Sequence, residues 1–225
     1  AMDPQQRSFL ENAWACLEDA GYRRGDLPTR TGVFAGLTTN TYALAAMEES
    51  LKGNLQIPDT DAYDVANRVS YFFDFRGPSM TVDTACSSSL TAIHLAVRSL
   101  RSGECDLALA GGVSLTLHPH RVIQFSNKKM LLAGSNEEPF GDGSGGFVDA
   151  EGVASVLLKP LEKALDDGDH IYGVIRGTAI NSGGRSGGYT VPNPAAQAEL
   201  IQAALEDAEV DARSVSYVEA HGTGT

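Results

Sequence analysis

The segment from residue 79 to residue 117 constrains the fold more than any other part of the chain. A short strand is predicted over residues 79–83, and a helix begins just after Cys86 and ends before Gly103. This helix carries one apolar stripe, formed by Leu90, Ile93, Ala96, Val97 and Leu100. A continuous apolar strand over residues 107–117 follows. Strand, sharp turn, helix and strand in this order predict a βαβ unit in a mostly parallel sheet that helices cover on both faces.

The remaining chain continues the alternation of helices and strands. Apolar residues at helical spacing predict further helices within residues 4–20, 38–52, 64–74, 160–167 and 194–208. Apolar runs predict further strands over residues 31–36, 147–158, 171–180 and 215–219. Asp3-Pro4 and Asn193-Pro194 each supply an N-cap followed by a proline suited to the first turn of a helix. The predicted fold class is therefore α/β.

The length of 225 residues corresponds to roughly one and a half domains. We expect residues 1–180 to form one half, which contains Cys86, and residues 181–225 to begin a second half. The last predicted strand, over residues 215–219, runs directly into His221, and no later element covers it. The sequence is therefore interpreted as a fragment of a longer domain.

Charge and composition exclude several classes of protein. There are 17 basic and 29 acidic residues, a net charge of −12, and the basic residues cluster only in pairs, which disfavours nucleic-acid binding. The longest apolar stretches fall far short of the roughly 20 residues that cross a bilayer, so we expect a soluble, cytoplasmic protein. Three irregularly spaced cysteines exclude a four-cysteine zinc site. The glycine-rich runs over residues 141–146 and 183–188 fit no phosphate-binding motif, so a bound nucleotide is not expected and the runs are interpreted as turns.

Cys86 is distinguished by its position. It lies in the run Asp-Thr-Ala-Cys-Ser-Ser over residues 83–88, between the predicted strand and the first turn of the helix. Unpaired N–H groups and the positive end of the macrodipole at a helix N-terminus favour thiolate over thiol. Because the turn also resembles a nucleophile elbow, we predict that Cys86 is a nucleophile, the alternative being a small buried cysteine. Cys16 and Cys105 are interpreted as inert core residues.

Five histidines are candidate partners of Cys86. Four are interpreted as packing or surface residues: His94, His118, His120 and His170. The first of these is eight residues along the same helix as Cys86, about 12 Å in rise, which is too far for contact. His221, flanked by Gly222, follows a predicted strand, and active sites of α/β sheets gather at strand ends. It is the leading candidate, with a structural role as the alternative.

Several motifs, in order along the chain, give a resemblance to a known family. They lie at residues 2–7 (Met-Asp-Pro-Gln-Gln-Arg), 66–70, 77–79, 82–90, 103–113, 187–194 and 221–225 (His-Gly-Thr-Gly-Thr). Together they resemble the ketosynthase (β-ketoacyl synthase) domain of modular type I polyketide synthases, in the thiolase-like superfamily. The resemblance implies a layered α-β-α-β-α fold, of which the chain would carry the N-terminal half and the start of the C-terminal half.

The resemblance also implies an activity and its residues. Cys86 would accept an acyl chain from a carrier protein, and His221 would be one of two histidines that stabilise the enolate formed when a malonyl extender loses carbon dioxide. Thr223 and Thr225 would line the tunnel for the phosphopantetheine arm. Because the acyl carrier protein supplies this arm, the resemblance implies neither a metal nor a bound cofactor. The expected reaction is a decarboxylative Claisen condensation between acyl and malonyl thioesters in a homodimer, with residues 107–117 as an interface element.

The chain departs from the family pattern in two ways. The second histidine, a lysine and a glycine-phenylalanine gating loop would lie beyond residue 225, so this piece alone is expected to be inactive. Gly141 replaces an aspartate, and residues 132–133 replace serine-proline, whereas Glu151 is retained. Because of the two replacements, the 132–146 loop is not expected to be ordered as it is in the family. The alternatives are a non-elongating domain that transfers acyl chains or docks carriers, and a thiol hydrolase. Because carriers are also acidic, a local basic patch at Arg98, Arg101 or Lys128 is expected to dock them.

Overall fold

The structure is a computed structural model that describes residues 2–134, 137–143 and 145–224. It divides into two compact units, Ala1–Leu158 with Ala220–Thr225, and Lys159–Glu219. The elements of the first unit are α1 (Pro4–Asp19), β1 (Thr31–Gly36), α2 (Tyr42–Leu51), α3 (Tyr63–Phe73), β2 (Ser79–Val82), α4 (Ser88–Arg101), β3 (Leu107–Ser114), α5 (His120–Asn127) and β4 (Gly152–Leu158). Those of the second are α6 (Leu161–Asp166), α7 (Pro194–Ala208) and the 3-10 helix η1 (Ala212–Ser214).

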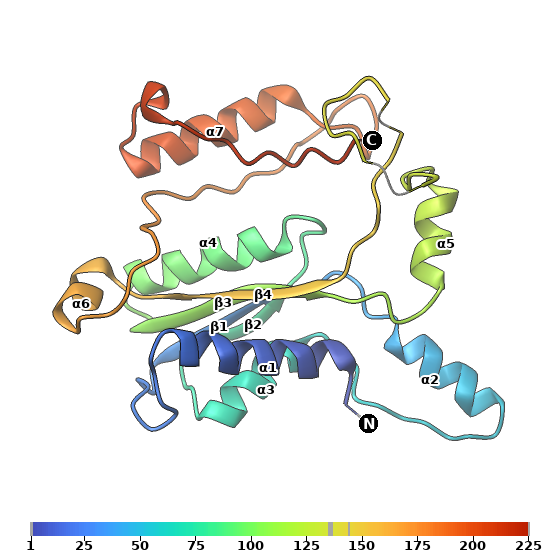
Figure 1. Cartoon of the computed structure of the whole chain (residues 1–225), viewed down its shortest axis with the longest axis horizontal. Coiled ribbons are helices and arrows are strands. Elements are labelled where there is room, and N and C mark those ends of the chain that lie inside the picture. The colour runs from blue at the N-terminus through green and yellow to red at the C-terminus, as the bar shows by residue number, and fades with distance from the viewer. Residues whose placement is uncertain (1, 135–136, 144, 225) are drawn as a thin grey trace. The chain divides into compact units, whose positions relative to one another are not determined.

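The first unit is built on a four-stranded sheet of order β2-β1-β3-β4 (Figure 1). β1 pairs in parallel with β2 and with β3, and β4 pairs antiparallel with β3. β2, α4 and β3 form the predicted βαβ unit, with β1 lying between its two strands. The predicted mostly parallel sheet is confirmed, and its antiparallel strand is at the edge.

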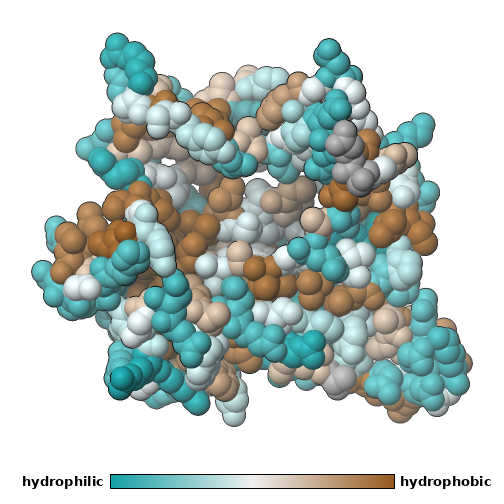
Figure 2. Space-filling view, viewed as in Figure 1, coloured by the Kyte–Doolittle hydropathy of each residue, from teal (hydrophilic) through white to brown (hydrophobic). Residues whose placement is uncertain are grey.

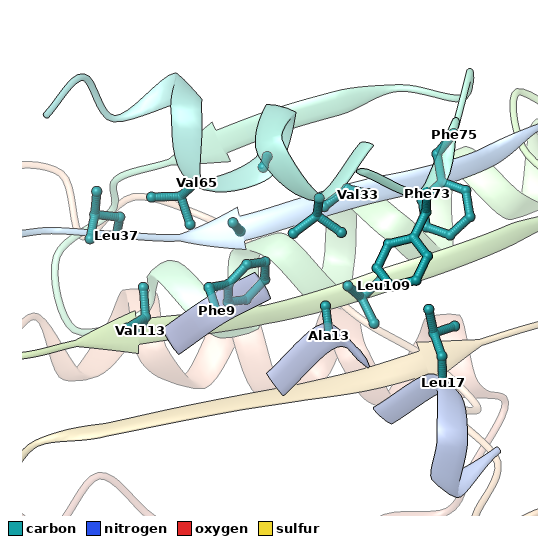
Figure 3. Packing of buried hydrophobic residues seen from close by; sticks show 13 residues of the cluster. Phe9, Ala13, Leu17, Val33, Leu37, Val65, Phe73, Phe75, Leu109 and Val113 are labelled. Carbon is teal, nitrogen blue, oxygen red and sulfur yellow. The ribbon is translucent and has the colours of Figure 1, made fainter. Parts of the chain in front are cut away.

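The two faces of the sheet bury different side chains, as the two-residue period of a strand requires. Val33 and its register partner Leu109 point toward α1 and α3, in the cluster drawn in Figure 3. Phe34 and its partner Ala110 belong to the cluster on the α4 side, where most of the other fully buried members are alanines. Helices therefore cover both faces of the sheet, and the predicted layered α/β fold is confirmed.

β3 is the most enclosed strand of the sheet. It has β1 on one side and β4 on the other, and its residues from Leu107 to Ala110 are at most 1% exposed. Both edges and both faces are occupied at these residues, so the expectation of an interface element is wrong for this part of residues 107–117. β3 also ends at Ser114, three residues earlier than predicted.

The buried face of α4 differs from the predicted stripe. Leu90 is 69% exposed, whereas Ser88, Thr91 and Ala92 are buried. The face that meets the sheet consists largely of small side chains, and helical spacing of larger apolar residues does not reveal such a face. Ala96 and Val97 of the predicted stripe are buried as expected.

Two predicted strands are not strands in the structure, and β4, like β3, is shorter than predicted. Residues 171–180 and 215–219 belong to no ladder among the described residues. Their apolar composition suits a strand, but a strand also needs a neighbour to receive its backbone hydrogen bonds. β4 begins at Gly152, and the predicted stretch before it contributes only one bridge, from Phe147 to Leu131.

In the second unit, the segment expected to be a strand packs along α7. The Thr178 amide donates to Asp207 (2.8 Å), and the Asn181 side-chain amide donates to the Ala196 carbonyl (2.7 Å). Asn193 caps α7 as predicted, since its side chain accepts from the amides of Ala195 and Ala196.

On the face shown in Figure 2, hydrophobic residues lie in separate patches among hydrophilic ones. No helix in the described ranges is long and apolar enough to cross a membrane.

The Asp-Pro-Gln-Gln-Arg motif begins α1 with a network of buried polar side chains. Asp3 is 1% exposed and caps the helix by accepting from the Gln5 amide (2.8 Å). Its second carboxylate oxygen is buried and has no hydrogen-bond partner in the described structure. Burial raises the pKa of this carboxyl group, and the Gln5 amide and the Asn40 side chain, which both favour the ionised form, only partly oppose the shift.

We expect Asp3→Asn to be more stable than the native protein at pH 7. The native pKa is raised, so the stabilising contribution of Asp3 is complete below its unfolded pKa of about 3.9 and is lost as the pH rises through the folded value. Asparagine keeps the capping oxygen and never ionises. Urea unfolding of the two proteins should show a stability difference at pH 7 that shrinks toward pH 4. A variant less stable by the same amount at both pH values would contradict this account.

Candidate active site

The turn that carries Cys86 connects the end of β2 at Val82 to the start of α4 at Ser88. The Cys86 thiol is exposed, whereas Cys16 is half-buried and Cys105 is buried. Burial raises the pKa of both of these other thiols, which keeps them in the unreactive form. Of the three cysteines, Cys86 is therefore the one available for chemistry, and the buried alternative for it is wrong.

Ala85, directly before Cys86, has a left-handed backbone with φ of 55°. This conformation costs an L-residue roughly 1–2 kcal/mol, so the surroundings must enforce it. The Ala85 amide donates to Asp83 Oδ1 (2.9 Å), and its carbonyl accepts from the Ser88 amide (3.1 Å) and the Ser88 hydroxyl (2.7 Å). The strand thus turns sharply into the helix, as expected of a nucleophile elbow.

Hydroxyl groups around the turn complete its hydrogen bonding. Ser88 Oγ accepts from the Thr84 amide (2.9 Å), and the Thr84 and Thr91 hydroxyls lie 2.9 Å apart. The Ser87 hydroxyl donates to the Thr84 carbonyl (2.9 Å). The serines and threonines that flank Cys86 in the sequence therefore hold the shape of the turn and leave the thiol exposed.

Two glycines allow the first turn of α4 to approach the sheet. Gly36 ends β1 and is the register partner of Gly112 in β3. A Cβ atom on Gly36 would lie 2.7 Å from Ser88 C and Ser89 N, and one on Gly112 would lie 3.1 Å from Ser89 Cβ. This close approach places the N-terminus of α4, and with it Cys86, at the carboxyl ends of the parallel strands.

We expect Gly36→Ala to push the first turn of α4 away from the sheet. The new methyl group would overlap backbone atoms, which cannot rotate away, so the free energy of unfolding should fall by about 1–3 kcal/mol. Gly25→Ala is the matched control, because a Cβ there meets nothing within 4 Å. The midpoints of urea unfolding measure the difference. Equal midpoints for the two variants would show that the turn accepts a side chain at residue 36.

His221 is exposed and lies in a loop that returns to the first unit. The Gly146 amide donates to the Gly224 carbonyl (3.0 Å), which ties this loop to the glycine-rich run over residues 141–146. Gly222 has φ of 49°, and a Cβ on it would lie 3.1 Å from the Phe140 ring. The predicted turn glycines thus hold the loop that carries His221.

The remaining predicted site residues are placed as follows. Thr223 is half-buried in the same loop, and Thr225 lies outside the described residues. No hydrogen bond in the described structure joins Cys86 to His221, so their partnership stays a prediction. The other histidines lie elsewhere. His118, for example, lies just before α5, and its Nε2 is 3.0 Å from the Glu48 carboxylate in α2.

Glu151, retained from the family pattern, has a clear local role. It accepts a hydrogen bond from the Thr116 amide (2.5 Å), and nearby Asp149 forms an ion pair with Arg121 (2.8 Å). These contacts fix the backbone that leaves β3. The expectation about the order of the 132–146 loop includes residues 135, 136 and 144, which lie outside the described residues.

No group of three potential metal ligands occurs in the described ranges. A cavity of about 450 Å³ lies beside α2 and is lined by Tyr42, Ala45, Ala46, Glu49, Asn54, Leu55, Gln56 and Pro58. It includes none of the predicted site residues.

The arrangement at Cys86, an exposed thiol on a rigid turn at a helix N-terminus, suits nucleophilic chemistry on an acyl group.

Sequence reasoning missed the residues that support the turn from other elements. Gly36, Gly112 and Thr38 all approach residues 85–89 although they are distant in sequence. Finding these three residues requires knowing that β1 and β3 pack against the first turn of α4, and local sequence patterns do not contain that information. The Asp-Pro-Gln-Gln-Arg motif is visible in the sequence, but the hydrogen bond from its Gln5 side chain to the Thr39 carbonyl in the loop after β1 (2.8 Å) is not.

Comparison with known proteins gives consistent matches over the whole chain. The model of the beta-ketoacyl synthase N-terminal domain matches residues 1–164, and that of the C-terminal domain matches residues 172–225. The chain is 50% identical to polyketide synthase PksL of Bacillus subtilis and 53% identical to polyketide synthase ThaG of Burkholderia thailandensis. All of this chain is covered in both matches, but it spans only 5% and 4% of those proteins.

Solved structures give the same result. An oxazolomycin ketosynthase domain of Streptomyces albus, OzmH KS7, matches with a TM-score of 0.96 and 49% identity. The ketosynthase from module 6 of the bacillaene synthase of Bacillus subtilis matches with a TM-score of 0.91 and 40% identity. Both matches cover this whole chain, and they cover 39% and 38% of the solved chains, respectively.

Proposed function

Because the chain belongs to the beta-ketoacyl synthase family, we propose that it forms part of an elongating ketosynthase of a polyketide synthase. The observation that carries the proposal is the exposed Cys86 thiol on a left-handed turn at the N-terminus of α4. The relatives named above are polyketide synthases, and the solved matches are an oxazolomycin ketosynthase domain and a ketosynthase from a module of the bacillaene synthase. Because the chain covers a small part of those proteins, we assign the proposed activity to a larger protein that contains it.

The proposed reaction has two stages. In the first, the Cys86 thiolate attacks the carbonyl of an acyl thioester, forms a new thioester and releases the thiol of the carrier's phosphopantetheine arm. Amides at the start of α4 favour the anionic sulfur and the oxyanion of the tetrahedral intermediate. Since the turn is held rigidly, little reorganisation is needed when charge develops.

In the second stage, a carrier-bound malonyl-type extender loses carbon dioxide and becomes an enolate. The enolate carbon attacks the acyl group on Cys86, a carbon–carbon bond forms, and the Cys86 thiolate leaves. We assign His221 to donate an N–H to the extender's thioester oxygen, where negative charge increases during decarboxylation. This interaction strengthens as the charge develops, so it lowers the barrier.

The proposed partners are the acyl carrier protein and a second copy of the protein. Thr223 and Thr225 are assigned to contact the phosphopantetheine arm. In the sheet, β2 has a strand neighbour on one side only within the described ranges, and a free strand edge can pair with another chain. We therefore assign the homodimer interface to β2, because the enclosed β3 has no free edge.

The candidate docking cations do not form one patch. Arg98 and Arg101 lie in the last turn of α4, about 15–20 Å along the helix from Ser88. Lys128 is exposed at the end of α5, the helix that follows the carboxyl end of β3 (Figure 1). That end of the sheet also carries the Cys86 turn, so we assign carrier docking to the side of Lys128.

Product analysis of the protein that contains this chain tests the proposed function. The protein is incubated with an acyl thioester carrier and a malonyl carrier, and the products are separated by mass. An acyl chain lengthened by two carbons supports an elongating ketosynthase. An acyl-enzyme that forms without lengthening would indicate a non-elongating domain, and release of free acid would indicate a thiol hydrolase. Either of these two results would overturn the proposal.

A further inference from the structure

We propose that Thr38 is a positioning residue that holds the Cys86 turn against the sheet for acyl transfer; this inference rests on the proposed function. Thr38 lies just after β1, and its hydroxyl donates to the Ala85 carbonyl (3.0 Å). The same hydroxyl lies 3.2 Å from the Ser88 hydroxyl. It therefore reaches both the residue before Cys86 and the first residue of α4.

The Thr38 hydrogen bond differs from the others that hold Ala85. The partners Asp83 and Ser88 lie within the same short segment as Ala85, so they move together with the turn. Thr38 lies 47 residues earlier and belongs to another strand connection. It is the one side chain outside residues 83–91 that hydrogen-bonds to this turn within the described residues. Local bonds give the turn its shape, and Thr38 fixes where the turn lies.

Hydrogen bonds at the two neighbouring residues, Leu37 and Thr39, hold the backbone on either side of Thr38. On one side, the Leu37 amide donates to the Val82 carbonyl (3.1 Å), which joins the ends of β1 and β2. On the other side, Gln5 is 1% exposed and donates to the Thr39 carbonyl (2.8 Å) while accepting from the Leu115 amide (3.0 Å). The loop carrying Thr38 is thus tied to the carboxyl ends of β2 and β3.

This arrangement affects acyl transfer through geometry. The sulfur must approach the thioester carbonyl along a defined direction, and a displacement of about 1 Å can reduce a rate on the order of 10²-fold. Loss of one of several hydrogen bonds should produce a smaller displacement, so we expect a loss of about tenfold. A small alkylating reagent needs no oriented carbonyl, so its reaction with Cys86 should change little.

The test compares Thr38→Val, Thr38→Ser and Thr39→Val in the full-length protein. Valine keeps the shape of threonine and removes the hydroxyl, and serine restores the hydroxyl. Thr39→Val is the matched control, because the Thr39 hydroxyl makes no hydrogen bond to the Cys86 turn within the described ranges. Acylation of Cys86 by an acyl thioester and its alkylation by iodoacetamide are followed by mass spectrometry. Alkylation of buried Cys105 in the same samples reports on unfolding.

We expect Thr38→Val to lower the maximal rate of acylation about tenfold with little change in KM, while iodoacetamide alkylation stays within twofold of the native rate. Thr38→Ser should recover most of the acylation rate, and Thr39→Val should match the native protein. If Thr38→Val does not fold, Thr38→Ala takes its place in the comparison with Thr38→Ser.

Three results would overturn the positioning role. The first is a native acylation rate in Thr38→Val, and the second is an acylation rate in Thr38→Ser that stays as low as in Thr38→Val. The third is a lowered acylation rate in Thr38→Val accompanied by alkylation of Cys105, which would indicate unfolding. If the native protein itself forms no acyl-enzyme, the proposed function is wrong. That result is distinct from the failure of Thr38.

Discussion

Replacing Cys86 by alanine is expected to reduce condensation by a factor on the order of 10³ or more. Without the sulfur no acyl-enzyme forms, so the enolate has no electrophile on the protein. The exposed thiol on its rigid turn is the basis for this expectation. The measurement is the rate of formation of the lengthened product by the full-length protein with both carriers present.

The other two cysteines supply the controls for this substitution. Cys16→Ala and Cys105→Ala remove thiols that are half-buried and buried, respectively, and whose pKa values burial raises. Both variants should retain condensation within a few-fold of the native rate as long as they fold. Condensation by Cys86→Ala at a rate near the native one would show that another group carries the acyl chain.

Replacing His221 by alanine is expected to lower condensation about 10²–10³-fold, the usual cost of one lost oxyanion donor. The first stage depends on Cys86 and the amides of α4, so acylation should remain within a few-fold of the native rate. The two stages are measured separately, by acyl-enzyme formation without extender and by product formation with it. This split distinguishes His221 from Cys86, whose loss removes both stages.

His170→Ala is the matched control for His221. His170 is exposed, lies in the other compact unit and contacts the Tyr172 ring. It should leave both rates unchanged. Equal loss of acylation and condensation in His221→Ala would indicate that His221 acts on Cys86 itself or only on the fold, and would contradict the assignment to the enolate.

Much of the fold could be predicted from local sequence patterns. The helices α1, α3 and α7 follow from apolar residues at helical spacing together with caps such as Asp3 and Asn193. The apolar strands β1 and β3 follow from short runs without charge, and the order β2, α4, β3 along the chain predicts a parallel βαβ unit. These signals lie within one element each, which is why the sequence reveals them.

The errors arise where a neighbour decides the structure. Residues 171–180 have strand composition but lie along α7, because no strand is available to pair with them in the described chain. Leu90 was assigned to the buried stripe of α4, but the glycine pair Gly36 and Gly112 brings a different, smaller face of the helix to the sheet. Apolar spacing alone does not encode such contacts. The division of the chain at residues 180 and 181 stays a prediction.

The site was predictable to a similar degree. The position of Cys86 between a strand and a helix was sufficient to select it, and its exposure and the left-handed Ala85 agree with that choice. Local patterns do not single out Thr38 or Gln5, because Thr38 reaches the Cys86 turn across 47 residues of sequence and Gln5 reaches the loop that carries Thr38 across 34 residues. The roles of His221, Thr223 and Thr225 depend on the family resemblance and stay proposals.

The most direct test of the account is the location of the acyl group. The full-length protein is incubated with an acyl thioester alone, digested and mapped by mass spectrometry. Within residues 1–225, one acyl group is expected, on the peptide that contains Cys86, and none on that peptide in Cys86→Ala. An acyl group on a different residue of this region, or a region that never becomes acylated in the native protein, would contradict the central role of Cys86.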